Sequence, residues 1–329
     1  MGFNRENYRR IKREYEGKNL RAKELAEERR AELHARIPEL RAIDDELSQL
    51  GLRIFETFTR YSGDALERVL TELRSENAEL LAIRADYLHR HGYPTDYSDV
   101  KYECEACMDT GFVELKMCRC MKERLVLAGY ESSGIGRLIQ TKSFDNFDPG
   151  YQKGDAKVTE NNHMIYQYCK KYASTFAGNG APNLLFIGAT GLGKTHLSAA
   201  IAGEVIAQGY DVVCETAQNF FADFEFERFD RPYGSREAGE ESKTDRYFNC
   251  DLLILDDLGT EMANQFTVAC LYNMINTRLN RGAPMIINTN LTRDELKKRY
   301  ADRITSRLFG EFLPMIFLGR DRRELKLGQ

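Results

Sequence analysis

The chain has no long hydrophobic run and no excess of positive charge. No stretch of about 18 apolar residues occurs, and the first residues, Met1 to Lys18, are polar and charged, which excludes a membrane span and a secretory signal. We therefore expect a cytoplasmic protein without a membrane partner, in which the eight cysteines are thiols or metal ligands rather than disulfides. Because the net charge is −4, any contact with nucleic acid has to come from a local patch.

The 329 residues have room for two or three domains, at roughly one domain per 150 residues. A hydrophobic fraction of 42% is enough for a sizeable core, and the charged residues are concentrated in the N-terminal third. Composition and pattern divide the chain into three predicted regions: a helical, coiled-coil arm over residues 1–95, a cysteine unit over residues 96–130, and an α/β domain over residues 131–329.

The predicted arm contains two amphipathic helical segments with few turn residues. Pro38 marks the start of a new helix, the chain turns near Ser62-Gly63, and the second segment stops at Gly92. Apolar residues spaced by threes and fours share one face of the first segment: Leu33, Ile37, Leu40, Ile43, Leu47, Leu50 and Ile54. The pattern fits a solvated helical domain or self-association device as well as a docking arm for a partner.

Four of the eight cysteines fall within seventeen residues, as Cys104-x2-Cys107 and Cys118-x-Cys120. Two close pairs of thiolates are what a tetrahedral structural Zn²⁺ site requires, and a small segment with little core gains stability from the metal. The Cys-x-Cys spacing is tighter than usual, and four ordinary thiols in a loop are the alternative. The remaining cysteines lie in apolar surroundings and are expected to be core thiols: Cys169, Cys214, Cys250 and Cys270.

From about residue 141 onward, short apolar runs alternate with helical stretches, which predicts a parallel sheet covered on both faces. The expected strands are Leu184–Ile187, Asp211–Cys214, Leu252–Leu255 and Pro284–Asn288. The first strand leads into a glycine loop and an alanine-rich helix, the context of a phosphate-binding P-loop. The predicted ATP-binding residues of this loop are Gly188, Ala189, Thr190, Gly191, Leu192, Gly193, Lys194 and Thr195.

An acidic pair, Asp256-Asp257, follows the buried strand Leu252–Leu255. In a P-loop ATPase an acidic residue at this position holds Mg²⁺, so we expect Thr195 and Asp256 to be the magnesium site. Asp257 stands where many such enzymes carry a glutamate that orients the attacking water. Because aspartate is one methylene shorter, hydrolysis is expected to be slow or to need a partner.

Further along, polar residues follow another apolar strand. Asn290 is the residue expected to position the lytic water or to sense the γ-phosphate, with Asn288 as the fallback. In the arginine-rich segment beyond it, Arg303 is the expected finger that a neighbouring subunit would supply, and Arg307 is a second candidate. A lone arginine on a helix is more often a solvated surface residue.

Taken in order, these motifs resemble the AAA+ ATPases of the DnaC/DnaI helicase-loader group and their relative IstB, the transposition helper. The resemblance covers about residues 131–329. The matching segments are Ser143–Phe147, Gly188–Thr195, Leu252–Gly259 with Glu261, Asn288–Leu291, Arg303–Leu308 and Gly319–Arg323. The cysteine unit is similar to the zinc-binding N-terminal region of DnaI-type loaders, which IstB proteins generally lack, whereas the long helical arm departs from both groups.

The resemblance implies αβα layers with a small helical lid, and self-association in which Arg303 faces the ATP of the next subunit. It also implies that Arg323 contacts the γ-phosphate of its own subunit. The implied task is ATP-dependent loading of a replicative helicase hexamer onto single-stranded DNA. Aromatic and arginine residues alternate in one stretch, which fits single-stranded DNA binding or a buried helix face: Phe220, Phe221, Phe224, Phe226, Arg228, Phe229, Arg231, Tyr233 and Arg236.

Two other functions stay open at this point. One is an IstB-like helper of a DNA transposase, against which the cysteine unit argues. The other is a nucleotide-switched adaptor with negligible catalysis. A metabolic kinase is disfavoured, because nothing in the sequence resembles a pocket for an acceptor substrate.

Overall fold

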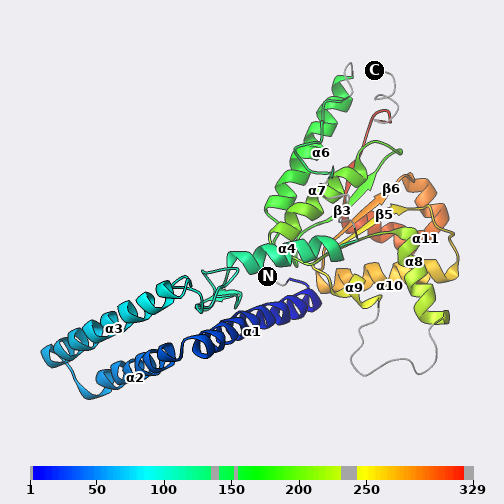
Figure 1. Ribbon diagram of the computed structural model, residues 1–329. Helices are drawn as coiled ribbons and strands as arrows, with labels where there is room; N and C mark the ends of the chain where they lie inside the picture. The colour runs from blue at the N-terminus through cyan, green and yellow to red at the C-terminus, as the bar shows by residue number, and fades with distance from the viewer. Residues whose placement is uncertain (1–2, 135–140, 152–154, 231–242, 322–329) are drawn as a thin grey trace. The chain divides into compact units, whose positions relative to one another are not determined.

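The computed structural model describes residues 3–134, 141–151, 155–230 and 243–321. It divides into two compact units, shown in Figure 1. The larger unit comprises Met1–Ile11 and Met121–Gln329, and the smaller unit comprises Lys12–Cys120. The cysteines of the predicted metal site belong to the smaller unit together with the helices. The three-part division expected from the sequence stays a prediction.

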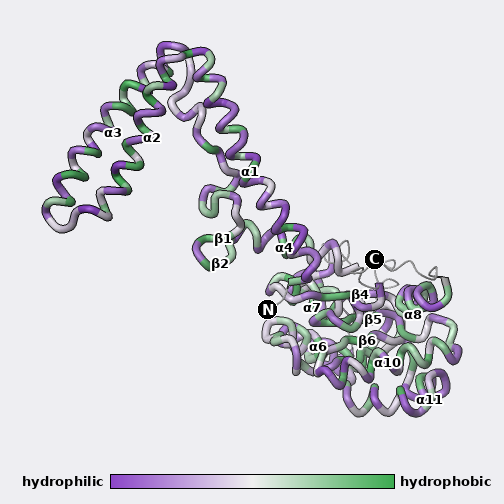
Figure 2. The backbone as a smooth tube through the Cα atoms, turned by 90° about the horizontal axis from the view of Figure 1, so that it is seen from below, coloured by the Kyte–Doolittle hydropathy of each residue, from purple (hydrophilic) through white to green (hydrophobic). Residues whose placement is uncertain are grey.

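Long helices make up most of the smaller unit. They are α1 (Arg5–Arg36, which begins in the larger unit), α2 (Pro38–Arg60) and α3 (Asp64–Arg90). As predicted, α2 begins at Pro38, and the chain turns between α2 and α3 at residues 61–63. Hydrophilic residues dominate α1, whereas α2 and α3 mix hydrophobic and hydrophilic positions (Figure 2).

Helices α2 and α3 form an antiparallel hairpin. The side chains of Arg84 and Asp44 lie 2.7 Å apart near its base, and those of Arg53 and Glu76 lie 3.0 Å apart nearer the turn. A small core of Leu33, Ile37, Leu40 and Leu88 is buried at the base. The apolar face predicted for residues 33–54 is therefore the face that packs.

The cysteine segment contains a short antiparallel hairpin, β1 (Phe112–Val113) and β2 (Lys116–Met117), and is followed by α4 (Arg119–Ser132). The carboxylate of Asp109 accepts hydrogen bonds from the backbone N–H groups of Glu103 (2.9 Å) and Cys104 (2.8 Å). These two bonds close the turn that carries the first cysteine pair.

The larger unit is built on a five-stranded sheet of order β4-β5-β6-β3-β7 in which all neighbours are parallel. The strands are β3 (Asn183–Ile187), β4 (Val212–Thr216), β5 (Leu252–Leu258), β6 (Met285–Thr289) and β7 (Phe312–Ile316). The four predicted strands are confirmed with shifts of one or two residues at most ends, although β5 continues three residues further. β7, at the edge of the sheet, was not predicted.

Helices cover both faces of this sheet, which gives the predicted αβα layers (Figure 1). One face packs against α6 (Ala156–Ser174) and α7 (Lys194–Ala207). The other packs against α8 (Ala217–Glu225), α9 (Asp245–Asn249), α10 (Gln265–Arg281) and α11 (Arg293–Gly310). A π-helical turn, η1 (Phe226–Asp230), follows α8.

The expected small helical lid is not found in the described part of the chain, where β7 is the last regular element before Asp321. Within the described residues, no helix is both long enough and apolar enough to cross a bilayer.

Candidate functional site

The loop between β3 and α7 has the backbone that a phosphate-binding turn needs. Gly188, Gly191 and Gly193 all have positive φ, at 155°, 78° and 102°, a region that L-residues seldom adopt. A Cβ at Gly188 would also lie 2.7 Å from the carbonyl oxygen of Phe317. At Gly191 the space of a Cβ is taken by the carboxylate of Asp321, so the C-terminal segment closely approaches the loop.

Lys194 is the first residue of α7 and is only 5% exposed. Its ammonium group donates hydrogen bonds to the carbonyl oxygens of Gly188 (2.6 Å) and Ala189 (2.8 Å) and to Oδ1 of Asn290 (2.5 Å). The charge is thus held inside the loop, and it lies beside the asparagine that the sequence singled out. A phosphate group entering the loop would meet a cation that is already positioned.

Asp256 lies at the carboxyl end of β5 and is 9% exposed. Its Oδ1 accepts hydrogen bonds from the Thr195 hydroxyl (3.2 Å) and from the side-chain amide of Asn288 (2.7 Å). Burial raises the pKa of Asp256 above its usual value, the negative charge of Asp257 adds to this rise, and the Asn288 hydrogen bond opposes it. A divalent cation would relieve the cost of the buried charge, so the two oxygen donors Thr195 and Asp256 fit Mg²⁺.

Asp257 has a positive φ of 54°, and the pairing of β5 with β6 shifts register between Leu255 and Leu258. This irregularity redirects the backbone at the acidic pair, as β-bulges beside active sites do. Asp256 is left buried against Asn288, while Asp257 lines the open cavity. Asp256 and Asp257 are adjacent in the sequence, but only the side chain of Asp257 reaches the cavity.

A cavity of about 650 Å³ brings these groups together, which is within the range of small-ligand pockets. It is lined by Thr141, Lys142, Asn146, Thr190, Gly191, Gly193, Lys194, Thr195, His196, Asp257 and Asn290. Four of these were not predicted as site residues: Thr141, Lys142, Asn146 and His196. Asn146 belongs to the Ser143–Phe147 motif, and His196 Nε2 lies 2.8 Å from the Ser143 carbonyl oxygen, which is how that distant motif reaches the loop.

The arginine candidates differ in their surroundings. Arg303 is exposed, and no hydrogen bond or ion pair involves its guanidinium among the described residues. Arg307 donates to the Tyr272 hydroxyl (3.0 Å) and to Asn276 Oδ1 (3.2 Å), which ties it to α10 of its own chain. Arg323 lies outside the described residues.

The aromatic stretch divides into a buried and an exposed part. Phe220 and Phe221 are buried in the core, so for them the buried helix face is correct. Phe226 and Phe229 are 46% and 67% exposed. Cations lie over both rings: Lys243 over Phe226 at 5.3 Å, and Arg228 over Phe229 at 5.5 Å. The predicted contributors Arg231, Tyr233 and Arg236 lie outside the described residues.

In the smaller unit, the sulfur atoms of Cys104, Cys107, Cys118 and Cys120 all lie within 4.8 Å of one another. The Cys104–Cys118 and Cys107–Cys120 sulfur pairs are 3.9 Å and 3.5 Å apart. Four thiolates around Zn²⁺ at about 2.3 Å from the metal would be spaced by about 3.8 Å. The cluster therefore has the donor set and nearly the spacing of a tetrahedral zinc site.

Residues 161–309 match the family described as IstB-like ATP binding protein. The chain is similar to the replicative helicase loader DnaC of Escherichia coli (strain K12), with 25% identity over 189 residues that cover 57% of this chain and 71% of DnaC. It is also similar to the phage-like element PBSX protein XkdC of Bacillus subtilis (strain 168), with 25% identity over 245 residues, 69% of this chain and 83% of XkdC. A crystal structure of DnaI matches with a TM-score of 0.44 and 20% identity, over 57% of this chain and 93% of that one.

Proposed function

We propose that residues 161–309, which match the IstB-like ATP binding family, are the core of an AAA+ ATPase domain and that the protein loads a replicative DNA helicase. The observation that carries the proposal is the similarity to DnaC over 71% of that loader, in a chain whose P-loop, Asp257 and Asn290 line one cavity. ATP binding would stabilise an assembled state on the helicase and on single-stranded DNA, and hydrolysis would release it.

The tasks of the nucleotide site would be divided among residues of α7, β5 and the segment after β6. Lys194 and the loop N–H groups would bind the phosphates, Thr195 and Asp256 would hold Mg²⁺, and Asp257 with Asn290 would orient the attacking water. Bound Mg²⁺ supplies charge neutralisation for the phosphates. Because Asp257 is short, we infer slow hydrolysis that depends on assembly.

Self-association would complete the site through Arg303. Its exposure and its lack of a partner within the described residues leave the guanidinium available to a neighbouring subunit, whereas Arg307 is bound to Tyr272 and Asn276. Arg323 is proposed as the γ-phosphate sensor from the family pattern alone. Arg303→Ala should spare nucleotide binding and impair hydrolysis in the assembly, and Lys194→Ala should abolish ATP binding.

For single-stranded DNA, the exposed rings of Phe226 and Phe229 with their neighbouring cations support the proposal best. Bases stack on aromatic rings while basic side chains meet the phosphates. Phe220 and Phe221 are excluded from this role by their burial.

Zn²⁺ in the cysteine cluster would stabilise the smaller unit, and the helical arm would dock the helicase.

One alternative has a specific observation in its favour. The matching family bears the name of IstB, which supports an ATPase helper of a DNA transposase. The cysteine cluster favours the loader, because it is the feature that IstB proteins generally lack. A nucleotide-switched adaptor is the third possibility, in which Asp257→Asn would keep biological function while Lys194→Ala would lose it.

The decisive experiment mixes the purified protein with the replicative helicase of the same organism and weighs the species by native mass spectrometry, with ATP, with ADP and without nucleotide. We expect a defined complex that is strongest with ATP and weaker for Lys194→Ala. Absence of a complex under all three conditions would overturn the loader proposal. A complex with a transposase in the same assay would establish the helper instead.

A further inference from the structure

Glu261 is a buried carboxylate that the nucleotide site does not use. It lies in the loop after β5, four residues beyond Asp257, and is only 6% exposed. Its Oε2 accepts a hydrogen bond of 2.9 Å from the backbone N–H of Gly259. The carboxylate is thereby fixed to the loop that leaves the acidic pair, and a buried charge of this kind requires further partners.

Those partners come from the first half of α11. The Tyr300 hydroxyl donates a hydrogen bond to Glu261 Oε1, and the Arg299 guanidinium donates one to the Glu261 carbonyl oxygen. Arg299 Nε also lies 3.9 Å from Glu261 Oε1. Because Tyr300 is fully buried, the contact ties α11 to the loop after the acidic pair at a point closed to water.

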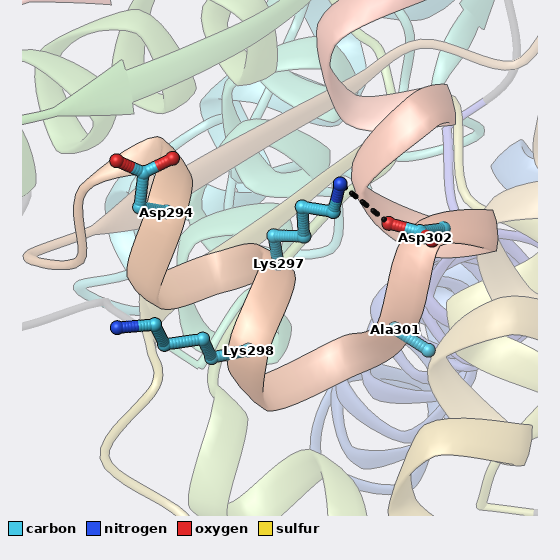
Figure 3. A pocket seen from close by; sticks show the side chains of 5 residues that line it. All are labelled: Asp294, Lys297, Lys298, Ala301 and Asp302. Atoms are coloured by element: carbon cyan, nitrogen blue, oxygen red, sulfur yellow. Dashed lines mark ion pairs between the residues drawn. The ribbon is translucent and has the colours of Figure 1, made fainter.

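Directly after Tyr300 the helix breaks. Ala301 has φ 65° and ψ 165° inside α11, a combination that is almost confined to glycine. A shallow pocket of about 530 Å³ opens beside it, lined by Asp294, Lys297, Lys298, Ala301 and Asp302. Figure 3 shows the Lys297–Asp302 ion pair, 3.2 Å long, connecting the two sides of the break.

The second half of α11 carries the proposed finger. Arg303 follows the break by two residues and is exposed, while Ile304 and Leu308 on the same half are buried in the core. The break therefore separates a segment held by Glu261 from a segment that presents Arg303. A shift of the first segment would be passed to the second through a single strained residue.

We propose that Glu261 is a positioning residue for Arg303: through Tyr300 and Arg299 it couples the loop after the acidic pair to the arginine that a subunit offers to its neighbour. The inference rests on the proposed finger role of Arg303 and adds to it the element that places the finger. When nucleotide binding moves the acidic pair of one subunit, the position of its Arg303 at the ATP of the next subunit would therefore change as well.

The test uses mixed assemblies of two full-length variants. Donor subunits carry Asp257→Asn, which disables their own site and keeps the finger; acceptor subunits carry Arg303→Ala, which keeps the site and removes the finger. Mixing should restore hydrolysis above the sum of the separate rates. Adding Tyr300→Phe to the donor should lower the restored rate by about tenfold, since a misplacement of 1 Å costs up to about a hundredfold. Adding Tyr300→Phe to the acceptor should leave the restored rate of hydrolysis unchanged.

Controls separate this role from a structural one. Tyr130→Phe in the donor removes another partly buried hydroxyl, which donates to the Gly203 carbonyl oxygen, and should have no effect. Glu261→Gln keeps an acceptor for Tyr300 and should retain more of the restored rate than Glu261→Ala. Hydrogen exchange of residues 302–310 should respond to ATP in the wild type and lose that response in Tyr300→Phe.

The outcomes are distinguishable. If unmodified donors fail to restore hydrolysis, the finger role of Arg303 is wrong and the positioning role falls with it. If donors restore hydrolysis but Tyr300→Phe acts only in the acceptor, or in neither subunit, the finger role stands and the Glu261 proposal is overturned.

Discussion

The side-chain amide of Asn288, on β6, donates a hydrogen bond of 2.7 Å to the carboxylate of Asp256, on β5. The same amide donates to the Ser198 hydroxyl (2.9 Å), and Asn288 has no exposed surface. Two adjacent strands and α7 thus hold the carboxylate of Asp256, the proposed magnesium ligand, in one orientation. Asn288, the fallback candidate for sensing the γ-phosphate, thus contacts the carboxylate of Asp256 directly.

Asn288→Leu should weaken magnesium-dependent nucleotide binding by roughly tenfold, because a hydrogen bond to a charged group contributes about 1.5–3 kcal/mol. Without the amide, the pKa of Asp256, already raised by burial, should rise further, so that binding is lost at a higher pH than in the wild type. Titration with a fluorescent ATP analogue at several pH values measures both effects. Asn161→Leu, which removes an amide bonded to the Ile316 carbonyl oxygen, is the matched control and should bind normally.

Zinc analysis should find one metal ion per chain, and Cys104→Ser should lower that content towards zero. Cys270→Ser, outside the cluster, should keep the full content. Because the segment around the hairpin β1–β2 has little core of its own, chelation should also increase its proteolysis. A folded, metal-free wild-type protein that resists proteolysis would contradict the zinc assignment.

The stability of the larger unit should depend on Asp211. Burial, with the nearby Asp251 charge, raises the pKa of Asp211 to about 6. The pKa of Asp211 in the folded protein therefore lies above its pKa in the unfolded chain. The protonated Asp211 side chain contributes to stability below about pH 4, and this contribution is lost as the pH rises through 6. Asp211→Asn keeps an acceptor for Asn4 and removes the titration.

Urea unfolding at pH 4.5 and 7.5 measures the difference between the two proteins. Between pH 4.5 and pH 7.5, we expect the free energy of unfolding of Asp211→Asn to rise by roughly 1–3 kcal/mol relative to that of the wild type. An equal response of both proteins to pH would show that Asp211 titrates normally.

Ala301→Gly should not destabilise the protein, because glycine adopts the observed φ of 65° without strain. Ala222→Gly, at an exposed position of α8, should cost about 1 kcal/mol, the usual penalty for glycine in a helix. Thermal unfolding of both variants makes the comparison. Equal losses would mean that residue 301 is an ordinary helical position in solution.

The sequence predicted the parts that depend on local pattern. Three features could be located because each depends only on residues close to it in the sequence. They are the apolar strand before the glycine loop, the strand that carries the acidic pair, and the proline at the start of α2. The clustering of the four cysteines was also predictable, because two close pairs joined by a short turn cannot lie far apart.

The remainder depends on contacts between residues distant in sequence. β7 was missed because Pro314 interrupts its short apolar run, and proline is tolerated there only because β7 is an edge strand. The break at Ala301 has no glycine or proline to mark it. The Tyr300–Glu261 contact joins residues 39 positions apart. It ties α11 to the loop after β5 because both side chains are buried, and hydrophobic periodicity does not predict such a contact.

The close approach of Asp321 to Gly191 places a negative charge beside the loop that would receive a triphosphate. Like charges repel strongly at such separations away from bulk water. An incoming nucleotide must therefore displace this carboxylate or neutralise it with its cation. The position of the Asp321 carboxylate should consequently depend on whether the phosphate loop is occupied, and a label at residue 321 would report the arrival of ATP.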